Sequence, residues 1–238
     1  MSSGRSRLDR FIARRTDHSL RDIKLLIAQQ RIIVDGKTAS SATQLVDQFS
    51  HVQIDNTALD YLIPTYIMLN KPVGVVSATV DSKHATVIDL VKNKNFFAEN
   101  LHIPGRLDFN STGLLLLTND GRWSKQLSDP TYNINKCYEV TLERDLTHEY
   151  IAAFNEGMYF EYEGITTRPA QLNILSSREA HVSLTEGRYH QIKRMFRFVG
   201  NRVTSLHRLS MSTIHLDEHL EPGQYRALTQ DEIDGALI

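Results

Sequence analysis

An unbroken run of four leucines at residues 114–117 constrains the fold of this chain more than any other feature. Continuous rather than alternating apolar residues indicate a strand buried on both faces, and the polar residues 119–121 predict the turn that ends it. If the segment before the run is extended, the side chains of Arg106 and Asp108 share one face while Leu107 enters the core. A guanidinium and a carboxylate on so rigid a base suit an active site. A surface ion pair beside an Asp-Asn-Ser turn is an equally good interpretation of these residues alone.

The composition is that of a globular protein, and the 238 residues suffice for one large domain or for a small and a medium one. The net charge is −1, so any nucleic-acid surface must be local. Cys137 is the single cysteine, which excludes an internal disulfide and a multi-cysteine metal site. No apolar run has the length of a signal-peptide core or a membrane span. We therefore expect a soluble cytoplasmic protein.

Basic residues gather at the start of the chain, where residues 1–37 hold nine basic and four acidic side chains. Apolar residues at helical spacing predict an amphipathic helix within residues 1–15 and a second helix capped by Ser19, and Asp35-Gly36 predicts a hairpin turn. Such a unit suits the phosphates of structured RNA, although most charge runs are simply solvated faces. The candidate RNA contacts on the first helix are Arg7, Arg10 and Arg14.

The remainder of the chain predicts a larger α+β unit after a linker at residues 56–64. Its patterns alternate between half-buried strands and short helices, and they end in a strand and a terminal helix. Strands are expected at 66–70, 114–117, 136–142, 171–175 and 181–184, and helices at 86–91, 123–127, 147–155 and 189–199.

A second basic cluster lies on the expected helix at 189–199, which Gly200 ends. One face of this helix is apolar, and the other carries cationic side chains. Two basic clusters in an otherwise acidic chain are more easily explained by one extended polyanion than by chance. The cationic residues are His190, Lys193, Arg194 and Arg197.

Several chemistries lack their motifs in this sequence. There is no G-x-x-x-x-G-K-S/T or G-x-G-x-x-G phosphate loop, no H-E-x-x-H zinc motif and no G-x-S-x-G nucleophile elbow. A phosphatase built on Asp-x-Asp would need a carboxylate where Asn110 stands, and glycosidases usually pair two carboxylates. One carboxylate flanked by cations suits a glycosidic bond that is broken and remade without water.

Four motifs resemble those of the pseudouridine synthases, and together they span nearly the whole chain. The order of the motifs is similar to that in the branch of the family that acts on ribosomal RNA and carries an N-terminal S4-type RNA-binding domain. Residues 5 to about 55 resemble that domain. Within that branch the fourth motif and the end of the chain look closest to the small-subunit (16S) enzymes. The motifs are Tyr66-Ile-Met-Leu-Asn-Lys71-Pro72-x-Gly74, Gly105-Arg-Leu-Asp108 with Gly113-Leu-Leu-Leu-Leu, Lys136-x-Tyr138-x-Val, and Glu186-Gly-Arg-Tyr-His-Gln-Ile-Lys193-Arg194-Met.

The resemblance implies a fold and a set of partners. The expected architecture is a small S4-type RNA-binding domain at residues 1–58 followed by a mixed, mostly antiparallel α+β catalytic domain at residues 62–238. The implied partner is ribosomal RNA or a small-subunit assembly intermediate. The protein would act as a monomer without metal, cofactor or membrane. The alternatives are a large-subunit (23S) synthase of the same branch and a non-catalytic RNA-binding or ribosome-assembly protein.

The resemblance also implies residue roles. Asp108 would be the catalytic carboxylate that attacks the uridine, kept ionised by Lys193 or, alternatively, Arg194. Tyr138 would stack on the uracil and could take the carbon 5 proton. Arg106 would fill the space left by the flipped base. Further RNA contacts are expected from Lys71, which would support the site or contact phosphate, and from Arg188 and Arg194.

Overall fold

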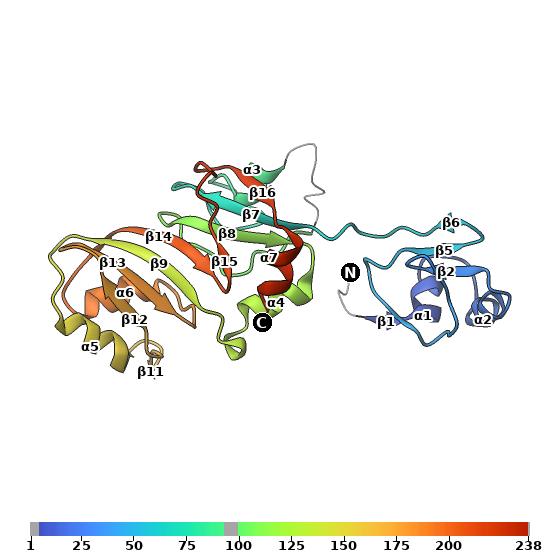
Figure 1. Ribbon diagram of the computed structural model, residues 1–238, viewed down its shortest axis with the longest axis horizontal. Coiled ribbons are helices and arrows are strands. Elements are labelled where there is room, and N and C mark those ends of the chain that lie inside the picture. The colour runs from blue at the N-terminus through green and yellow to red at the C-terminus, as the bar shows by residue number, and fades with distance from the viewer. Residues whose placement is uncertain (1–4, 93–99, 238) are drawn as a thin grey trace. The chain divides into compact units, whose positions relative to one another are not determined.

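A computed structural model describes residues 5–92 and 100–237 of the chain. The chain divides into two compact units, Met1–Pro64 and Thr65–Ile238 (Figure 1). None of the helices that the structure describes is long and apolar enough to cross a membrane.

The first unit packs two short helices against a small antiparallel sheet. Ser19 and Asp22 cap the second helix reciprocally, as the sequence predicts. The strand order is β3-β2-β5-β6, and β1 pairs separately with β4. The unit has its own apolar core, which includes Leu8, Ile23 and Val52. The elements are β1 (Ser6–Arg7), α1 (Leu8–Ala13), α2 (Leu20–Ala28), β2 (Ile32–Val34), β3 (Lys37–Thr38), β4 (Leu45–Val46), β5 (Val52–Ile54) and β6 (Thr57–Ala58).

Two boundaries in this unit differ from the sequence prediction. The first helix begins only at Leu8, because Ser6 and Arg7 pair with β4. Residues 57–58, which the sequence assigns to the linker, form β6 against the edge of β5. Both changes come from backbone pairing with a neighbouring strand, which local composition does not reveal.

The second unit is built on one large mixed sheet. Its strand order is β12-β13-β9-β14-β8-β7-β16, with β15 paired to β14. All neighbours are antiparallel except β14 and β8, which run parallel. The strands are β7 (Tyr66–Lys71), β8 (Thr112–Thr118), β9 (Lys136–Leu142), β12 (Gln171–Ile174), β13 (Glu179–Leu184), β14 (Val203–Met211), β15 (Ile214–His215) and β16 (Tyr225–Ala227). A separate small hairpin joins β10 (Tyr159–Phe160) and β11 (Ile165–Thr166).

Helices cover both faces of this sheet, so the leucine run is buried on both sides as predicted. Leu115 and Leu117 join the core under α3, α5 and α6, whereas Leu114 and Leu116 join the core on the other face with α4 and α7. All four leucines are fully buried. The helices are α3 (Val87–Val91), α4 (Gly121–Ser128), α5 (Glu149–Glu156), α6 (Gln191–Phe198) and α7 (Gln230–Gly235), with a 3-10 turn at Pro130–Tyr132.

Strand β14 was not predicted from the sequence, and it occupies the centre of the sheet between β9 and β8. Arg208 on β14 pairs with Tyr138 on β9 and with Gly113 on β8. Gly113 has φ +100°, and a Cβ there would lie 2.4 Å from the Arg208 carbonyl oxygen. This close approach holds the start of β8, and therefore the loop before it, against β14.

Candidate active site

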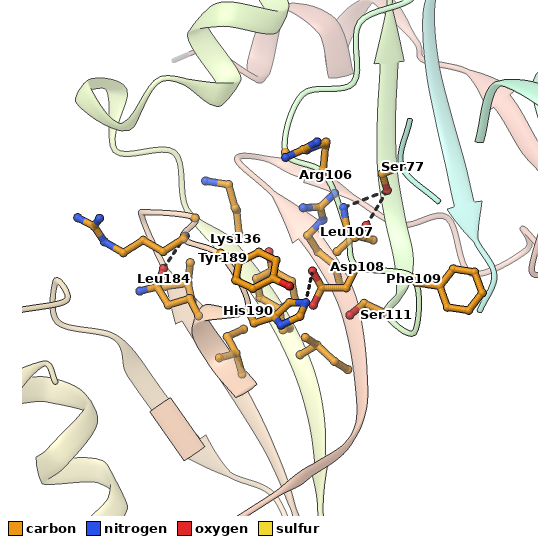
Figure 2. A pocket seen from close by; sticks show the side chains of 18 of the residues that line it. Ser77, Arg106, Leu107, Asp108, Phe109, Ser111, Lys136, Leu184, Tyr189 and His190 are labelled. Carbon is orange, nitrogen blue, oxygen red and sulfur yellow. Dashed lines mark hydrogen bonds and ion pairs between the residues drawn. The ribbon is translucent and has the colours of Figure 1, made fainter. Parts of the chain in front are cut away.

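A cavity of about 490 Å³ opens in the second unit, beside the loop that precedes β8 (Figure 2). That loop supplies Arg106 and Asp108 to the lining, and β9 supplies Tyr138. The segment that leads into α6 forms another wall with Tyr189 and His190. A volume of this size is typical of small-molecule sites, which occupy roughly 300–1,000 Å³.

The Asp108 carboxylate has two cationic or potentially cationic neighbours. The Lys193 ammonium lies 3.0 Å from Oδ2, and His190 Nε2 lies 3.5 Å from Oδ1. The Asp108 side chain keeps 29% of its exposure, so a substrate can still reach it. The structure thus brings together Asp108 and Lys193, which are 85 positions apart in the sequence.

Arg194, the alternative cation, turns away from Asp108. Its guanidinium donates to Glu163 Oε1 at 2.7 Å and lies over the Phe160 ring, 3.7 Å from the ring centroid. Neighbouring positions of a helix point in different directions, so only one of the pair Lys193 and Arg194 can reach Asp108, and it is Lys193 that does.

His190 is a partner of Asp108 that the sequence analysis did not identify. It precedes α6 in the left-handed conformation, with φ +50°, which costs free energy in a residue with a Cβ. The exposed Tyr189 ring stacks on it at a centroid distance of 3.9 Å. The spacing of three between His190 and Lys193 was the available signal, because positions i and i+3 share a face at a helix end.

Two buried polar contacts hold the loop that carries Asp108. Ser77 Oγ donates to the Leu107 carbonyl at 2.8 Å and accepts from the Leu107 amide at 3.1 Å. Leu107 itself enters the core, as predicted. On the other side of Asp108, the Lys71 ammonium donates to the loop carbonyls of Ser111 at 2.8 Å and Phe109 at 3.5 Å.

Lys71 has no exposed surface, so the expectation that it contacts phosphate is wrong. Burial lowers its pKa to about 8, with Asp108 opposing and Lys193 adding to that decrease. Because the ammonium is beneath the loop and bonded to loop carbonyls, it supports the loop from below. This was the other role considered for Lys71.

Lys136 and Tyr138 are two positions apart on β9, so their side chains share one face of the strand, and both line the cavity. Lys136 is labelled in Figure 2. The Tyr138 side chain is almost fully buried, at 8% exposure. The guanidinium of Arg208 lies 5.9 Å from the centroid of the Tyr138 ring. Tyr138, which we predict to stack on the uracil, therefore lines the same cavity as Asp108.

Two arginines stand at the rim. Arg106 is exposed and lines both the main cavity and an adjoining pocket of about 240 Å³. Arg188 also lines the main cavity, and its Nε donates to the buried Glu186 carboxylate at 3.1 Å. The Arg106 guanidinium is therefore available to a ligand, whereas the Glu186 carboxylate partly offsets the charge of Arg188.

The N-terminal arginines belong to the first unit. Arg7 pairs with the buried carboxylate of Asp9 at 2.6 Å, while Arg10 and Arg14 are exposed. Arg7 therefore has a role in packing α1, and the other two present their charge to solvent. Within residues 5–92 and 100–237, no group of three or more His, Cys, Asp or Glu residues is arranged to hold a metal ion.

Comparison with known proteins places the chain in a family. The model of the RNA pseudouridylate synthase family matches residues 65–198. A Pseudomonas aeruginosa protein named ribosomal small subunit pseudouridine synthase A is 46% identical over 95% of this chain and 98% of that protein. Its Escherichia coli namesake is 39% identical over the same shares. A crystal structure described as that of a pseudouridylate synthase matches with a TM-score of 0.70 and 37% identity, over 97% of this chain and 99% of that one. This chain therefore belongs to the RNA pseudouridylate synthase family of isomerases.

Proposed function

We propose that this protein converts a uridine of small-subunit ribosomal RNA to pseudouridine. The names of its full-length relatives support this RNA as the substrate. The observation that carries the proposal is the contact of 3.0 Å between the Asp108 carboxylate and the Lys193 ammonium at a cavity walled by Tyr138.

Asp108 acts as the nucleophile toward the flipped uridine. The negative charge of the carboxylate is what attacks, and a cation in contact with it lies where the charge is needed. Lys193 supplies that cation from α6, and Lys71 and Ser77 hold the loop on which Asp108 sits. Tyr138 stacks on the uracil ring and takes the proton of carbon 5, directly or through water.

Replacing Lys193 by methionine should lower the rate of product formation about 100-fold, a typical cost of removing one electrostatic contact from a reacting group. The affinity for RNA should change little, because the Lys193 side chain is only 30% exposed and directed at Asp108. Single-turnover kinetics separates the two quantities. Lys193→Arg should lose less activity than Lys193→Met. Equal losses in both variants, or none in Lys193→Met, would remove the charge of Lys193 from the mechanism.

Arg106 occupies the position vacated by the flipped base. Flipping costs a few kcal/mol of lost stacking and pairing, and a side chain that fills the gap offsets part of this cost. Arg106 is suited to the role because it is exposed at the rim, two residues from Asp108. Arg188, which also lines the cavity, contacts the RNA backbone.

The first unit acts as an S4-type RNA-binding domain. Its two-helix architecture and its separate apolar core support this assignment, together with the exposed charges of α1 and the turn that follows. Its contacts with phosphates position the RNA without reading its sequence. The substrate is either the free RNA or a partly assembled small subunit.

The variant with both Arg10→Gln and Arg14→Gln should bind RNA more weakly and with a flatter salt dependence. Each lost phosphate contact reduces the slope of log K against log salt by about 0.9, so two contacts give a decrease of about 2. Filter binding over a range of salt concentrations measures this slope. Arg178→Gln in the second unit, where Arg178 is paired with Asp145, is the matched control. A slope unchanged by the double substitution would exclude these arginines from the RNA contact.

The proposed activity is tested by release of tritium from RNA labelled at carbon 5 of uridine. Small-subunit and large-subunit RNA are assayed separately, each as bare RNA and as partly assembled particles. Release from small-subunit substrate alone is expected. Release only from large-subunit RNA would transfer the activity to that RNA, and binding of every substrate without release would make the protein an RNA-binding factor.

A further inference from the structure

Arg208 carries a buried charge that the protein itself does not satisfy. The residue is completely buried, and its Nε donates to the Leu114 carbonyl at 2.7 Å. Nη1 and Nη2 are also buried, and neither has a hydrogen-bond partner among the residues that the structure describes. A buried charged donor without a partner is destabilising, so such a group in a native fold calls for a specific explanation.

Lys136 is a second buried cation in the same part of the cavity. Its ammonium, a group with three donors, donates to the Ile134 carbonyl at 2.9 Å. Burial, with the nearby charge of Arg208 adding to it, lowers the pKa of Lys136 to about 8, so the ammonium remains mostly protonated at neutral pH. Two cations thus lie close together, and no carboxylate forms an ion pair with either within the described parts of the chain.

These cations line the cavity that also holds Asp108 and Tyr138. Lys136 enters it from β9, whereas Asp108 enters from the loop before β8 (Figure 2). The Tyr138 ring is beside the Arg208 guanidinium, at 5.9 Å. A flipped uridine with its sugar carbon at Asp108 and its ring against Tyr138 would have Lys136 and Arg208 in the same cavity, available to the edge of the base that carries O2, N3 and O4, here called the far edge.

We propose that Lys136 and Arg208 form a binding site for the two carbonyl oxygens of the uracil after it has left the ribose. The inference rests on the proposed function and deepens it. When an oxygen of the Asp108 carboxylate bonds to C1′, the bond between C1′ and N1 breaks. The electron pair of the broken bond remains on the base, which is then a monoanion with charge shared by O2 and O4. Carbon 5 next bonds to C1′ while the bond from Asp108 to C1′ breaks and its electron pair returns to the carboxylate. The carbon 5 proton leaves and N1 gains a proton, so that the product is an isomer of the substrate. Two cations at the far edge stabilise the anion while it is free.

The symmetry of uracil explains why one pair of cations serves both ends of the reaction. The rotation that exchanges N1 and carbon 5 also exchanges O2 and O4, and leaves N3 in place. The far edge therefore presents two oxygen acceptors in the same positions before and after the rotation. Charge-assisted hydrogen bonds from Lys136 and Arg208 can hold either arrangement.

The test uses two free bases of similar shape, namely uracil, which is neutral at pH 7, and 5-nitrouracil, which is ionised there. Calorimetric titration of the full chain should show about tenfold tighter binding of 5-nitrouracil, the value of one charge-assisted hydrogen bond. Lys136→Met should lose most of this preference, and Arg208→Lys, which retains the charge but not the planar fork, should lose part of it. Lys125→Met removes an exposed lysine of α4 and should leave the preference intact.

Equal binding of the two bases by the wild type, or an unaltered preference in Lys136→Met, would overturn the proposal. If inorganic phosphate binds and Lys136→Met abolishes that binding while the bases do not differ, the two cations hold an RNA phosphate instead. Because these titrations need no turnover, they are independent of the proposed function. If the protein releases no tritium but still prefers the anionic base, the binding site is supported and the proposed reaction is excluded.

Discussion

Asp108→Asn should lower the rate of pseudouridine formation by about 10³-fold or more, since removing a nucleophile typically costs at least this much. The amide is nearly isosteric with the carboxylate and can still accept a hydrogen bond from Lys193, which lies 3.0 Å away in the wild type. It carries no charge and is not a nucleophile. The RNA affinity should therefore stay within about twofold of the wild type, because the phosphate contacts that dominate affinity are elsewhere.

Tritium release and filter binding measure the two quantities, and Asp145→Asn supplies the matched control. Asp145 is an exposed carboxylate of the same unit, paired with Arg178 at 2.8 Å, and it is not part of the cavity lining. Full activity in Asp108→Asn would end its assignment as nucleophile. If Asp108→Asn loses both RNA binding and thermal stability, the loop around residue 108 instead depends on the carboxylate for folding.

Gly113→Ala should destabilise the second unit by about 3 kcal/mol or more, combining a left-handed backbone with overpacking. Gly113 has φ +100°, and its new Cβ would lie 2.4 Å from the oxygen and 2.6 Å from the nitrogen of the Arg208 backbone. A backbone contact cannot be relieved by changing a rotamer, so β8 and β14 must separate. The same separation would shift the Asp108 loop, and activity should fall with stability.

Urea unfolding followed by tryptophan fluorescence measures this effect in the correct unit. Trp123 is the single tryptophan, and it is buried in the second unit on α4. Gly187→Ala is the matched control, since a Cβ at Gly187 meets nothing within 4 Å. That variant should stay within about 0.5 kcal/mol of the wild type. Similar losses in the two variants would mean that the close approach at Gly113 is not the cause.

Local sequence patterns predict the strands and helices whose formation depends on interactions between residues only a few positions apart. Apolar continuity identified β8, because each of its leucines must find a core on one face or the other. Alternation identified β9, and reciprocal capping by Ser19 and Asp22 identified α2. Strand β14 was missed because His207 and Arg208 interrupt its apolar pattern. Both are polar residues placed in the middle of the sheet, and Arg208 is completely buried.

The sequence by itself determined which side chains could carry the chemistry, since the choice of Asp108, Tyr138 and Lys193 follows from the resemblance of their motifs to those of the pseudouridine synthases. Tertiary structure alone decided which of them meet. It brought Lys193 rather than Arg194 to the carboxylate, added His190, and removed Lys71 from the surface by burying it under the loop. It also placed Arg208 at the cavity through the parallel pairing of β14 with β8. The physical reason is range: backbone propensity and periodicity act over a few residues, whereas burial and the distance between charges depend on strands paired across nearly a hundred positions.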